Sequence, residues 1–289
     1  MNFQEKTIFI TGATRGIGKA IALRLAKEGA NIIIAAKSVT ENEKLGGTIF
    51  SAAEEIEAAG GKAHPVQCDI RFEDQIKHAV EEGISKFGGI DMVINNASAI
   101  SLTNTEKTEP KRFDLMHDIN VRGTFFVVQT CLPFLKKSAH PHILTLSPPV
   151  NLNVKWLAAH IPYTLSKYNM SLMAMAWAAE FKEYGIASNA LWPKTTIDTA
   201  AVRNLLGGEA LAKVSRKPQI LADTAYYILS KNPDDTEMKL REKLPEKYWI
   251  DINDLLVVYG QNLCTPISPF CSKCKIEKYC SKINVETHR

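Results

Sequence analysis

Short apolar runs alternate with longer amphipathic stretches along most of the chain. The stretches carry apolar residues at helical spacing, as at Ile17, Ile21 and Leu25, and the first such helix is expected to end at Gly29. The apolar runs have the length of strands, and they occupy residues 7–10, 31–36, 64–68, 90–95, 142–147 and 186–191. Strands that alternate with helices predict an α/β fold built on a doubly wound parallel sheet. The ligand of such a sheet binds at the carboxyl ends of its strands.

The alternation stops after the helix that follows the sixth run. From there the sequence predicts a turn, a charged helix that begins at Asp235 or Thr236, a break at Pro245 and a second amphipathic helix, with no further strand. We therefore expect two domains, a sheet domain over 1–233 and a small helical tail over 234–289.

The composition is that of a chain able to bury its own core. Of 289 residues, 45% are hydrophobic and 23% are charged, and the formal net charge of +4 is too small for a nucleic-acid-binding stripe. No apolar run is long enough to span a membrane and no signal peptide precedes the first strand, so we expect a cytoplasmic protein without membrane contact. In that compartment, a cluster of four of the six cysteines near the end of the chain indicates a metal site and not disulfides.

The segment TGATRGIG lies between the first strand and the first helix. Its glycines Gly12, Gly16 and Gly18 allow a tight turn and let the backbone approach a pyrophosphate at the helix N-terminus. Three glycines also occur in ordinary turns, but here the strand and the helix are both present. Arg15 stands in the loop and Lys37 follows the second strand, where no carboxylate is available to bind a ribose hydroxyl. Two cations suit a 2′-phosphate, so NADP is preferred over NAD.

The segment YTLSK places Tyr163 and Lys167 four residues apart on a predicted helix, and hence on one face. A lysine ammonium near a tyrosine favours the phenolate and is expected to lower the tyrosine pKa, which would make the phenol a proton donor or acceptor near neutral pH. Most pairs with this spacing lie on solvated faces, so the pair alone is weak evidence for catalysis.

Together these motifs resemble the short-chain dehydrogenases/reductases. TGATRGIG, NNAS at 95–98, DINVRGTF around Asn120 and YTLSK at 163–167 stand in the order and spacing of that family, over residues 6 to about 231. Further segments resemble its hydroxysteroid dehydrogenase-like branch; they are AAK at 35–37, ASAISLTNT at 97–105, LSPPVNLN at 146–153 and NALWPKT at 189–195. The resemblance implies a Rossmann-like fold and an NADP-dependent oxidoreductase that transfers a hydride between the nicotinamide and a carbonyl or secondary alcohol.

The resemblance also assigns roles to residues. Tyr163 is implied as the proton donor or acceptor, Lys167 as the group that holds the ribose hydroxyls and tunes the tyrosine, and Asn120 as support for a water that links this lysine to solvent. The residues implied in cofactor binding contact the pyrophosphate, the two riboses and the adenine, and they are Gly12, Thr14, Arg15, Gly16, Ile17, Gly18, Lys37, Asp69, Asn95 and Lys167.

The sequence departs from the family pattern in two places. The substrate-orienting serine of the family is usually the second residue of a Ser-Ser pair, whereas here Ser147 is first and Pro148 follows it. Ser147 is the candidate for the hydroxyl that polarises the carbonyl, with Thr145, or a Ser147 that takes no part in catalysis, as alternatives. The second departure is that the last strand of the family, expected soon after residue 231, is missing, which would leave the sixth strand open and weaken oligomer contacts.

The tail carries the pattern Cys-x6-Cys-x2-Cys-x5-Cys, formed by Cys264, Cys271, Cys274 and Cys280. Four thiolates suit either a [4Fe–4S] cluster or a structural Zn²⁺. Zinc sites more often use two Cys-x2-Cys pairs, and this loop has one, which favours the iron–sulfur cluster.

Residues 236–283 also resemble the C-terminal end of the endonuclease III family of DNA glycosylases, including the cysteine spacing of its iron–sulfur loop. The helix-hairpin-helix and the catalytic lysine and aspartate of that family have no counterpart here. Weak, non-specific contact with DNA phosphates through the tail is therefore the most that this resemblance implies. The chain looks like a fusion of two partial modules, either natural or constructed.

Three functions follow from these patterns. The first is an NADP-dependent oxidoreductase acting on a small carbonyl or alcohol. The segment after residue 191 is expected to fold over the nicotinamide, and its small and apolar residues favour an apolar or acyl substrate. The second is a DNA-binding or repair-related iron–sulfur module without glycosylase activity. The third is an inactive fusion that binds only cofactor and metal.

Overall fold

The computed structural model describes residues 3–231. The predicted helical tail, its metal loop at Cys264, Cys271, Cys274 and Cys280, and the resemblance over 236–283 lie outside the described residues. Within 3–231, six parallel strands form one sheet in the order β3-β2-β1-β4-β5-β6. The strands are β1 (Thr7–Thr11), β2 (Asn31–Ala36), β3 (Lys62–Gln67), β4 (Met92–Asn95), β5 (His142–Leu146) and β6 (Ala187–Leu191).

All six predicted strands are present, and the predicted doubly wound parallel sheet is confirmed. Strand β4 begins at Met92 and not at residue 90; just before it, the carboxylate of Asp91 accepts the backbone N–H of Thr7 at 2.9 Å. Pro65 has no N–H to donate and is tolerated in β3 because that strand lies at one end of the described sheet.

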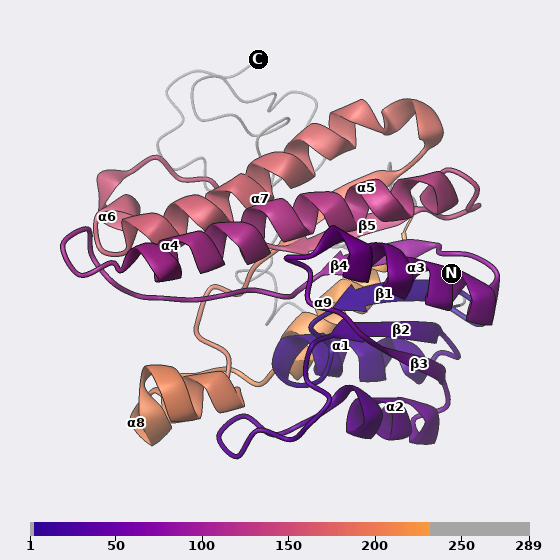
Figure 1. Ribbon diagram of the computed structural model, residues 1–289, viewed down its shortest axis with the longest axis horizontal. Coiled ribbons are helices and arrows are strands. Elements are labelled where there is room, and N and C mark those ends of the chain that lie inside the picture. The colour runs from indigo at the N-terminus through magenta and orange to yellow at the C-terminus, as the bar shows by residue number, and fades with distance from the viewer. Residues whose placement is uncertain (1–2, 232–289) are drawn as a thin grey trace, which may run out of the picture.

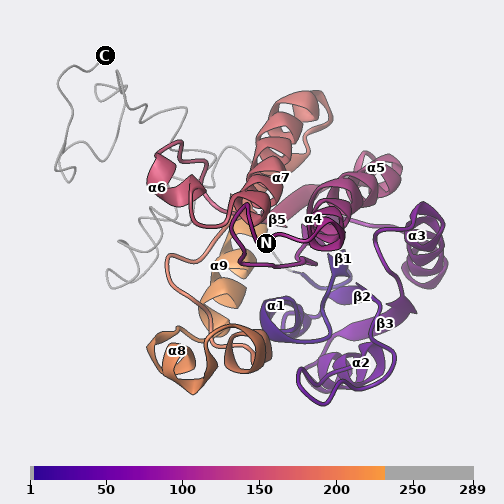
Figure 2. The same ribbon diagram turned by 60° about the vertical axis from the view of Figure 1, so that its left-hand side comes forward.

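The sheet is covered by helices on both faces (Figures 1 and 2). The α-helices are α1 (Gly16–Ala26), α2 (Ile49–Ala58), α3 (Glu73–Phe87), α4 (Pro110–His117), α5 (Thr124–Leu135), α6 (Val154–Leu157), α7 (Ile161–Glu180), α8 (Gly208–Val214) and α9 (Gln219–Leu229), and shorter helical segments are the π-helices η1 (Asp118–Gly123) and η3 (Val202–Leu206) and the 3-10 turn η2 (Lys182–Tyr184).

Two hydrophobic clusters form the core, one on each face of the sheet. Ile8 and Ile10 of β1 join the cluster that includes buried residues of α1, α2 and α9, whereas Phe9 between them joins the cluster that includes α3, α5 and α7. Successive side chains of a strand point to opposite faces, so one apolar run supplies both layers. This is why strands such as β1 and β2, which are buried along their whole length, are apolar runs in the sequence.

Strand β6 lies at the other end of the described sheet and pairs only with β5 among the residues described. The chain passes from β6 through η3 and α8 to α9, which packs against α1. In the part of the chain that the structure covers, none of the helices combines the length and the apolar character that crossing a bilayer requires.

Candidate active site

The glycine loop connects β1 to α1 at the carboxyl edge of the sheet. Gly12 and Gly16 have φ angles of +68° and +58°, which side chains with a Cβ rarely adopt. A Cβ on Gly18 would lie 2.4 Å from Nδ2 of Asn96 and 2.7 Å from the Gly12 carbonyl oxygen. All three predicted glycines are therefore required by the backbone path, and the loop opens at the N-terminus of α1.

Asn96 locks this loop in place and was not predicted from the sequence. Its Nδ2 donates to the carbonyl oxygens of Thr11 (3.0 Å) and Gly12 (2.9 Å), and its backbone N–H donates to Oγ1 of Thr11 at 3.0 Å. The available signal was the second asparagine of NNAS, which directly follows β4. Only the pairing of β4 with β1 shows that this residue faces the glycine loop.

Arg15 turns toward the end of β2. Its Nε donates to Oγ1 of Thr14 at 3.2 Å and its Nη2 donates to Oγ of Ser38 at 2.5 Å, while its buried Nη1 has no hydrogen-bond partner among the described residues. Burial lowers the pKa of the guanidinium. Lys37 is exposed directly after β2. Arg15 is thus tied to Ser38, the residue after Lys37, whereas Ile17 packs partly against the core and has no polar side-chain group to offer a ligand.

Asp69 follows β3 and is held by Arg71. The guanidinium binds both carboxylate oxygens, with Nη2 2.6 Å from Oδ2 and Nε 3.0 Å from Oδ1. Burial alone would raise the pKa of Asp69, but the hydrogen bonds and charge of Arg71, with a contribution from Lys37, outweigh it and lower the pKa. Asp69 is therefore a fixed carboxylate at the carboxyl end of its strand, where the adenine contact was predicted.

Asn95 and Asn120 lie buried on the other side of the loop. Asn95 donates from Nδ2 to Oγ1 of Thr145 at 3.3 Å, and its Oδ1 has no partner within the described chain. Asn120 sits in the π-helix η1, a distortion that is frequent at functional sites. Its amide pairs with both backbone groups of Ala99 (2.8 and 3.0 Å) and donates to Oγ of Ser166 at 2.9 Å. It thus joins η1 to the loop after β4 and to α7, while its predicted water link stays a prediction.

Tyr163 and Lys167 lie one turn apart on α7, as predicted. Lys167 is fully buried, and its Nζ donates to the Leu146 carbonyl oxygen at 2.6 Å and contacts Sδ of Met170 at 3.1 Å. Burial lowers the pKa of Lys167 to about 7 and raises the pKa of Tyr163 to about 12. The prediction that Lys167 lowers the tyrosine pKa is therefore wrong for the chain without cofactor, because the desolvation of both groups dominates.

Ser147 directly follows β5 and the Leu146 carbonyl that Lys167 binds. It is fully buried, its backbone N–H donates to the Leu191 carbonyl oxygen at 3.1 Å, and its Oγ has no hydrogen-bond partner among the residues described. The alternative candidate Thr145 is engaged, because its Oγ1 accepts from Asn95. Of the two hydroxyls, Ser147 is the one left to bind a ligand.

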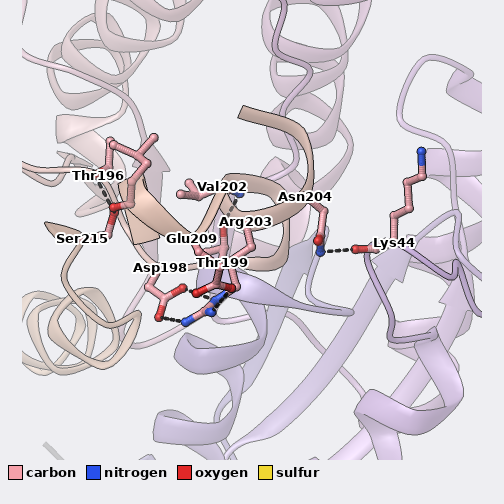
Figure 3. A network of polar contacts seen from close by, with 10 residues as sticks. Lys44, Thr196, Asp198, Thr199, Val202, Arg203, Asn204, Glu209 and Ser215 are labelled. Carbon is pink, nitrogen blue, oxygen red and sulfur yellow. Dashed lines mark hydrogen bonds and ion pairs between the residues drawn. The ribbon is translucent and has the colours of Figure 1, made fainter. Parts of the chain in front are cut away.

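The segment after β6 reaches back to the glycine loop and to the loop after β2; Figure 3 shows its polar contacts, including the one with Lys44. A Cβ on Gly16 would lie 3.4 Å from Cγ2 of Thr199, so the segment covers the start of α1. Arg203 of η3 binds both carboxylate oxygens of Asp198 (2.6 and 2.7 Å) and one of Glu209 at 2.6 Å. Asn204 donates to the Lys44 carbonyl oxygen at 2.6 Å, which connects this cover to the loop after β2.

A metal centre is not visible within the described range. No group of three or more histidine, cysteine, aspartate or glutamate side chains comes together between residues 3 and 231. Cys68 and Cys131 are buried in the core, and burial raises their thiol pKa values. The four cysteines predicted as ligands lie outside this range, so the [4Fe–4S] cluster and its zinc alternative stay predictions.

Comparison with known proteins gives a consistent result. The model of the short chain dehydrogenase family matches residues 6–209. Hydroxysteroid dehydrogenase-like protein 2 of Xenopus laevis is 57% identical over 230 residues, which cover 80% of this chain and 55% of that protein. The Homo sapiens protein of the same name is 58% identical over 225 residues, covering 78% and 53%. The chain thus spans about half the length of these curated relatives.

Solved structures show the same fold. A short chain dehydrogenase from Mycobacterium thermoresistibile is 49% identical, has a TM-score of 0.79, and the match covers 84% of this chain and 89% of that one. Two chains with TM-scores of 0.66 share the fold at 22% and 24% identity; one was crystallised with NADP and the other with NAD. By the family model, by its relatives and by the arrangement of its glycine loop, serine, tyrosine and lysine, the chain belongs to the short-chain dehydrogenase family.

Proposed function

We propose that this chain is a nicotinamide-dependent oxidoreductase that reduces a carbonyl group or oxidises the corresponding secondary alcohol. The observation that carries the proposal is that Lys167 reaches the carbonyl oxygen of Leu146, next to the buried and unpartnered hydroxyl of Ser147, while Tyr163 lies one helical turn before this lysine on α7. A buried hydroxyl without a partner costs free energy unless a ligand supplies one. The carbonyl oxygen of a substrate would be such a partner.

The residues around the glycine loop fit a dinucleotide. The glycine loop makes a tight turn that leads into the N-terminus of α1. Buried polar atoms of Arg15 and Asn95 have no hydrogen-bond partner in the described chain. When bound, the nicotinamide would supply or accept the hydride. The pyrophosphate would lie on the Gly12–Gly18 loop, while Asn95 and Asp69 would face the nicotinamide and adenine ends.

Among the two nicotinamide cofactors, we propose NADP(H). The support is Arg15, which donates to Ser38, and Lys37, which directly precedes that serine after β2, where an NAD-selective site carries a carboxylate. The Nη1 of Arg15 is a buried donor that a 2′-phosphate oxygen would satisfy. The shared fold does not discriminate, because structural neighbours bind either cofactor.

Each residue of the site has a distinct task in carbonyl reduction. With its pKa raised to about 12, Tyr163 carries its proton at neutral pH and can donate it to the carbonyl oxygen as the hydride adds to the carbon. The ammonium form of Lys167 would stabilise the phenolate left behind. The Ser147 hydroxyl would donate a hydrogen bond to the same oxygen and orient it. Alcohol oxidation runs the same steps in reverse and needs the phenolate at the start.

The substrate is proposed to be apolar. Two elements expose large apolar side chains, α6 with its flanks and η3, which leads into α8. Helices α6 and α8 lie at the same end of the molecule, on the left of Figure 1. Leu152, Val154 and Trp156 belong to the first, and Leu205 belongs to the second. An acyl chain or other apolar body would cover this surface.

The decisive experiment is the oxidation of NADPH, followed by absorbance, with methyl ketones from butan-2-one to dodecan-2-one as substrates. Tyr163→Phe is expected to lower kcat/KM by about 10²- to 10⁴-fold while NADPH binding is retained, since only the proton donor is removed. Tyr184→Phe, an exposed tyrosine after α7, is the matched control. An unmutated protein that binds neither NADPH nor NADH would refute the proposal, as would full activity in the Tyr163→Phe variant.

Cofactor preference is tested by the Kd values of NADPH and NADH from nucleotide fluorescence. Arg15→Ala and Lys37→Ala should each weaken NADPH binding about tenfold or more and leave NADH binding nearly unchanged, because a charge-assisted hydrogen bond contributes about 1.5 to 3 kcal/mol. Lys27→Ala, an exposed lysine at the far end of α1, is the control. Equal losses for both nucleotides would contradict the assignment of the 2′-phosphate site.

A further inference from the structure

The connection between β5 and α6 starts at the unpartnered hydroxyl of Ser147 and continues with two prolines. Ser147 is tied to β6 through its backbone N–H, which donates to Leu191 at 3.1 Å. Pro148 and Pro149 have no N–H, so these two residues can donate no backbone hydrogen bond to hold the segment in place. Contacts that fix the path of the chain after Ser147 must therefore involve the carbonyl groups of these prolines or residues that follow them.

Helix α7 supplies these contacts from two side chains. The Oγ of Ser171 donates to the Pro148 carbonyl oxygen at 2.5 Å. The Oη of Tyr168 donates to the Asn151 carbonyl oxygen at 2.8 Å and accepts the N–H of the same residue at 3.3 Å. Tyr168 and Ser171 are both buried, so both hydroxyls are held by the packing of α7, although Asn151 itself is exposed.

The anchored segment ends where these contacts end. Beyond Asn151 the chain is open to solvent, with Leu152 and Val154 exposed to 78% and 74%. On the other side of the segment, Lys167 of the same helix binds the Leu146 carbonyl oxygen at 2.6 Å. One helix therefore carries the proton donor and also fixes both ends of the segment that carries the buried serine hydroxyl.

We propose that Tyr168 and Ser171 are positioning residues that aim the Ser147 hydroxyl at the substrate carbonyl beside Tyr163. They act on the backbone at Pro148 and Asn151, one and four residues after the serine. The two prolines limit the chain to few conformations, and the two hydroxyls select the one in which the serine stays buried without a partner of its own. The inference rests on the proposed carbonyl chemistry, which gives the aimed hydroxyl its task.

The test uses Tyr168→Phe and Ser171→Ala, which remove hydroxyls and keep the packing. Each is expected to lower kcat/KM for decan-2-one by about tenfold to a hundredfold, the cost of a misplacement of about 1 Å at a reacting group. The NADPH Kd should stay within about twofold. The matched control is Ser188→Ala, a buried serine whose Oγ donates to the Ala174 carbonyl oxygen of α7 at 2.9 Å and does not contact the segment.

A double-mutant cycle separates positioning from general destabilisation. If Tyr168 acts through Ser147, then Tyr168→Phe should have little effect on kcat/KM once Ser147→Ala is present. Losses that simply multiply in the double variant would overturn the inference. So would an unchanged kcat/KM in both single variants.

Amide hydrogen exchange of residues 150–157 in the cofactor-free protein gives a readout that does not depend on turnover. Tyr168→Phe should speed the exchange of this segment, while Ser188→Ala should not, and urea unfolding identifies any variant that fails to fold. Unchanged exchange in the Tyr168→Phe variant would overturn the anchoring. Faster exchange in a protein that reduces no ketone would instead refute the proposed function, and with it the positioning role.

Discussion

Replacement of Lys167 by methionine should abolish activity and at the same time stabilise the cofactor-free protein. The side chain is 2% exposed, and burial lowers its pKa from 10.5 to about 7. At about 1.4 kcal/mol for each unit of pKa, keeping this lysine in the fold at pH 7 costs on the order of 4 to 5 kcal/mol. Methionine has a similar length and no charge. Loss of the hydrogen bond to Leu146 would offset about 1 to 3 kcal/mol, which leaves a net gain of about 1 to 4 kcal/mol.

The direction in which stability changes with pH follows from the pKa values of Lys167 in the unfolded and folded states. The unfolded lysine binds its proton below about pH 10.5, whereas the folded one does so only below about pH 7. Between these values the unfolded state holds more protons, so the contribution of Lys167 to stability is lost as the pH falls from 10.5 to 7. The advantage of Lys167→Met should therefore be largest at pH 7 and below and should shrink toward pH 10.

Urea unfolding of both proteins at pH 7, 8, 9 and 10 measures this difference. Tyr163, whose pKa burial raises to about 12, is common to both proteins and cancels in the comparison. Lys86→Met, on the exposed side of α3, should show no such trend with pH. A Lys167→Met variant that is less stable than the unmutated protein at pH 7, or whose advantage is constant with pH, would refute the reasoning.

Three further predictions concern the loop, the cover and the tail. Gly18→Ala should destabilise the protein by about 1 to 3 kcal/mol and prevent NADPH binding, because the new Cβ would lie 2.4 Å from the Asn96 amide. The control Gly89→Ala, where a Cβ would have nothing within 4 Å, should not weaken binding, and thermal melts and nucleotide fluorescence measure both variants. Asp198→Asn should speed amide exchange across residues 198–209 with little change in melting temperature, since Arg203 loses one of its carboxylate partners. The control is Asp223→Asn, because Asp223 is an exposed ion-pair partner of Arg24. If the tail binds a [4Fe–4S] cluster, anaerobically purified protein should be brown with about four irons per chain, and replacement of its cysteines by serine should remove the colour; zinc without iron would establish the alternative.

Much of the sheet and of the site could be predicted from local sequence. Most of the strands are largely apolar runs because both of their faces are buried, and glycines 12, 16 and 18 occur where the backbone has a positive φ or where a Cβ would collide. Tyr163 and Lys167 were predicted as a pair because helical spacing alone brings them to one face. These features depend on period and backbone sterics, which are readable in a single stretch of chain.

What could not be predicted depends on contacts between distant segments. Asn96 reaches Gly12 because β4 pairs with β1, and Tyr168 reaches Asn151 because α7 folds back along the connection after β5. Neither residue carries a local pattern that marks these partners.

The direction of the tyrosine pKa shift is another property that local sequence could not predict, because it depends on distant segments. The sequence by itself determined the order of strands and helices, the glycine loop and the identities of the reactive side chains, since these follow from periodicity and from the chemistry of single residues. The tertiary structure alone decided that Lys167 binds the carbonyl of Leu146 and that Tyr163 is buried enough for its pKa to rise. The physical reason is that desolvation depends on everything that surrounds a group, and most of what surrounds these two comes from elsewhere in the chain.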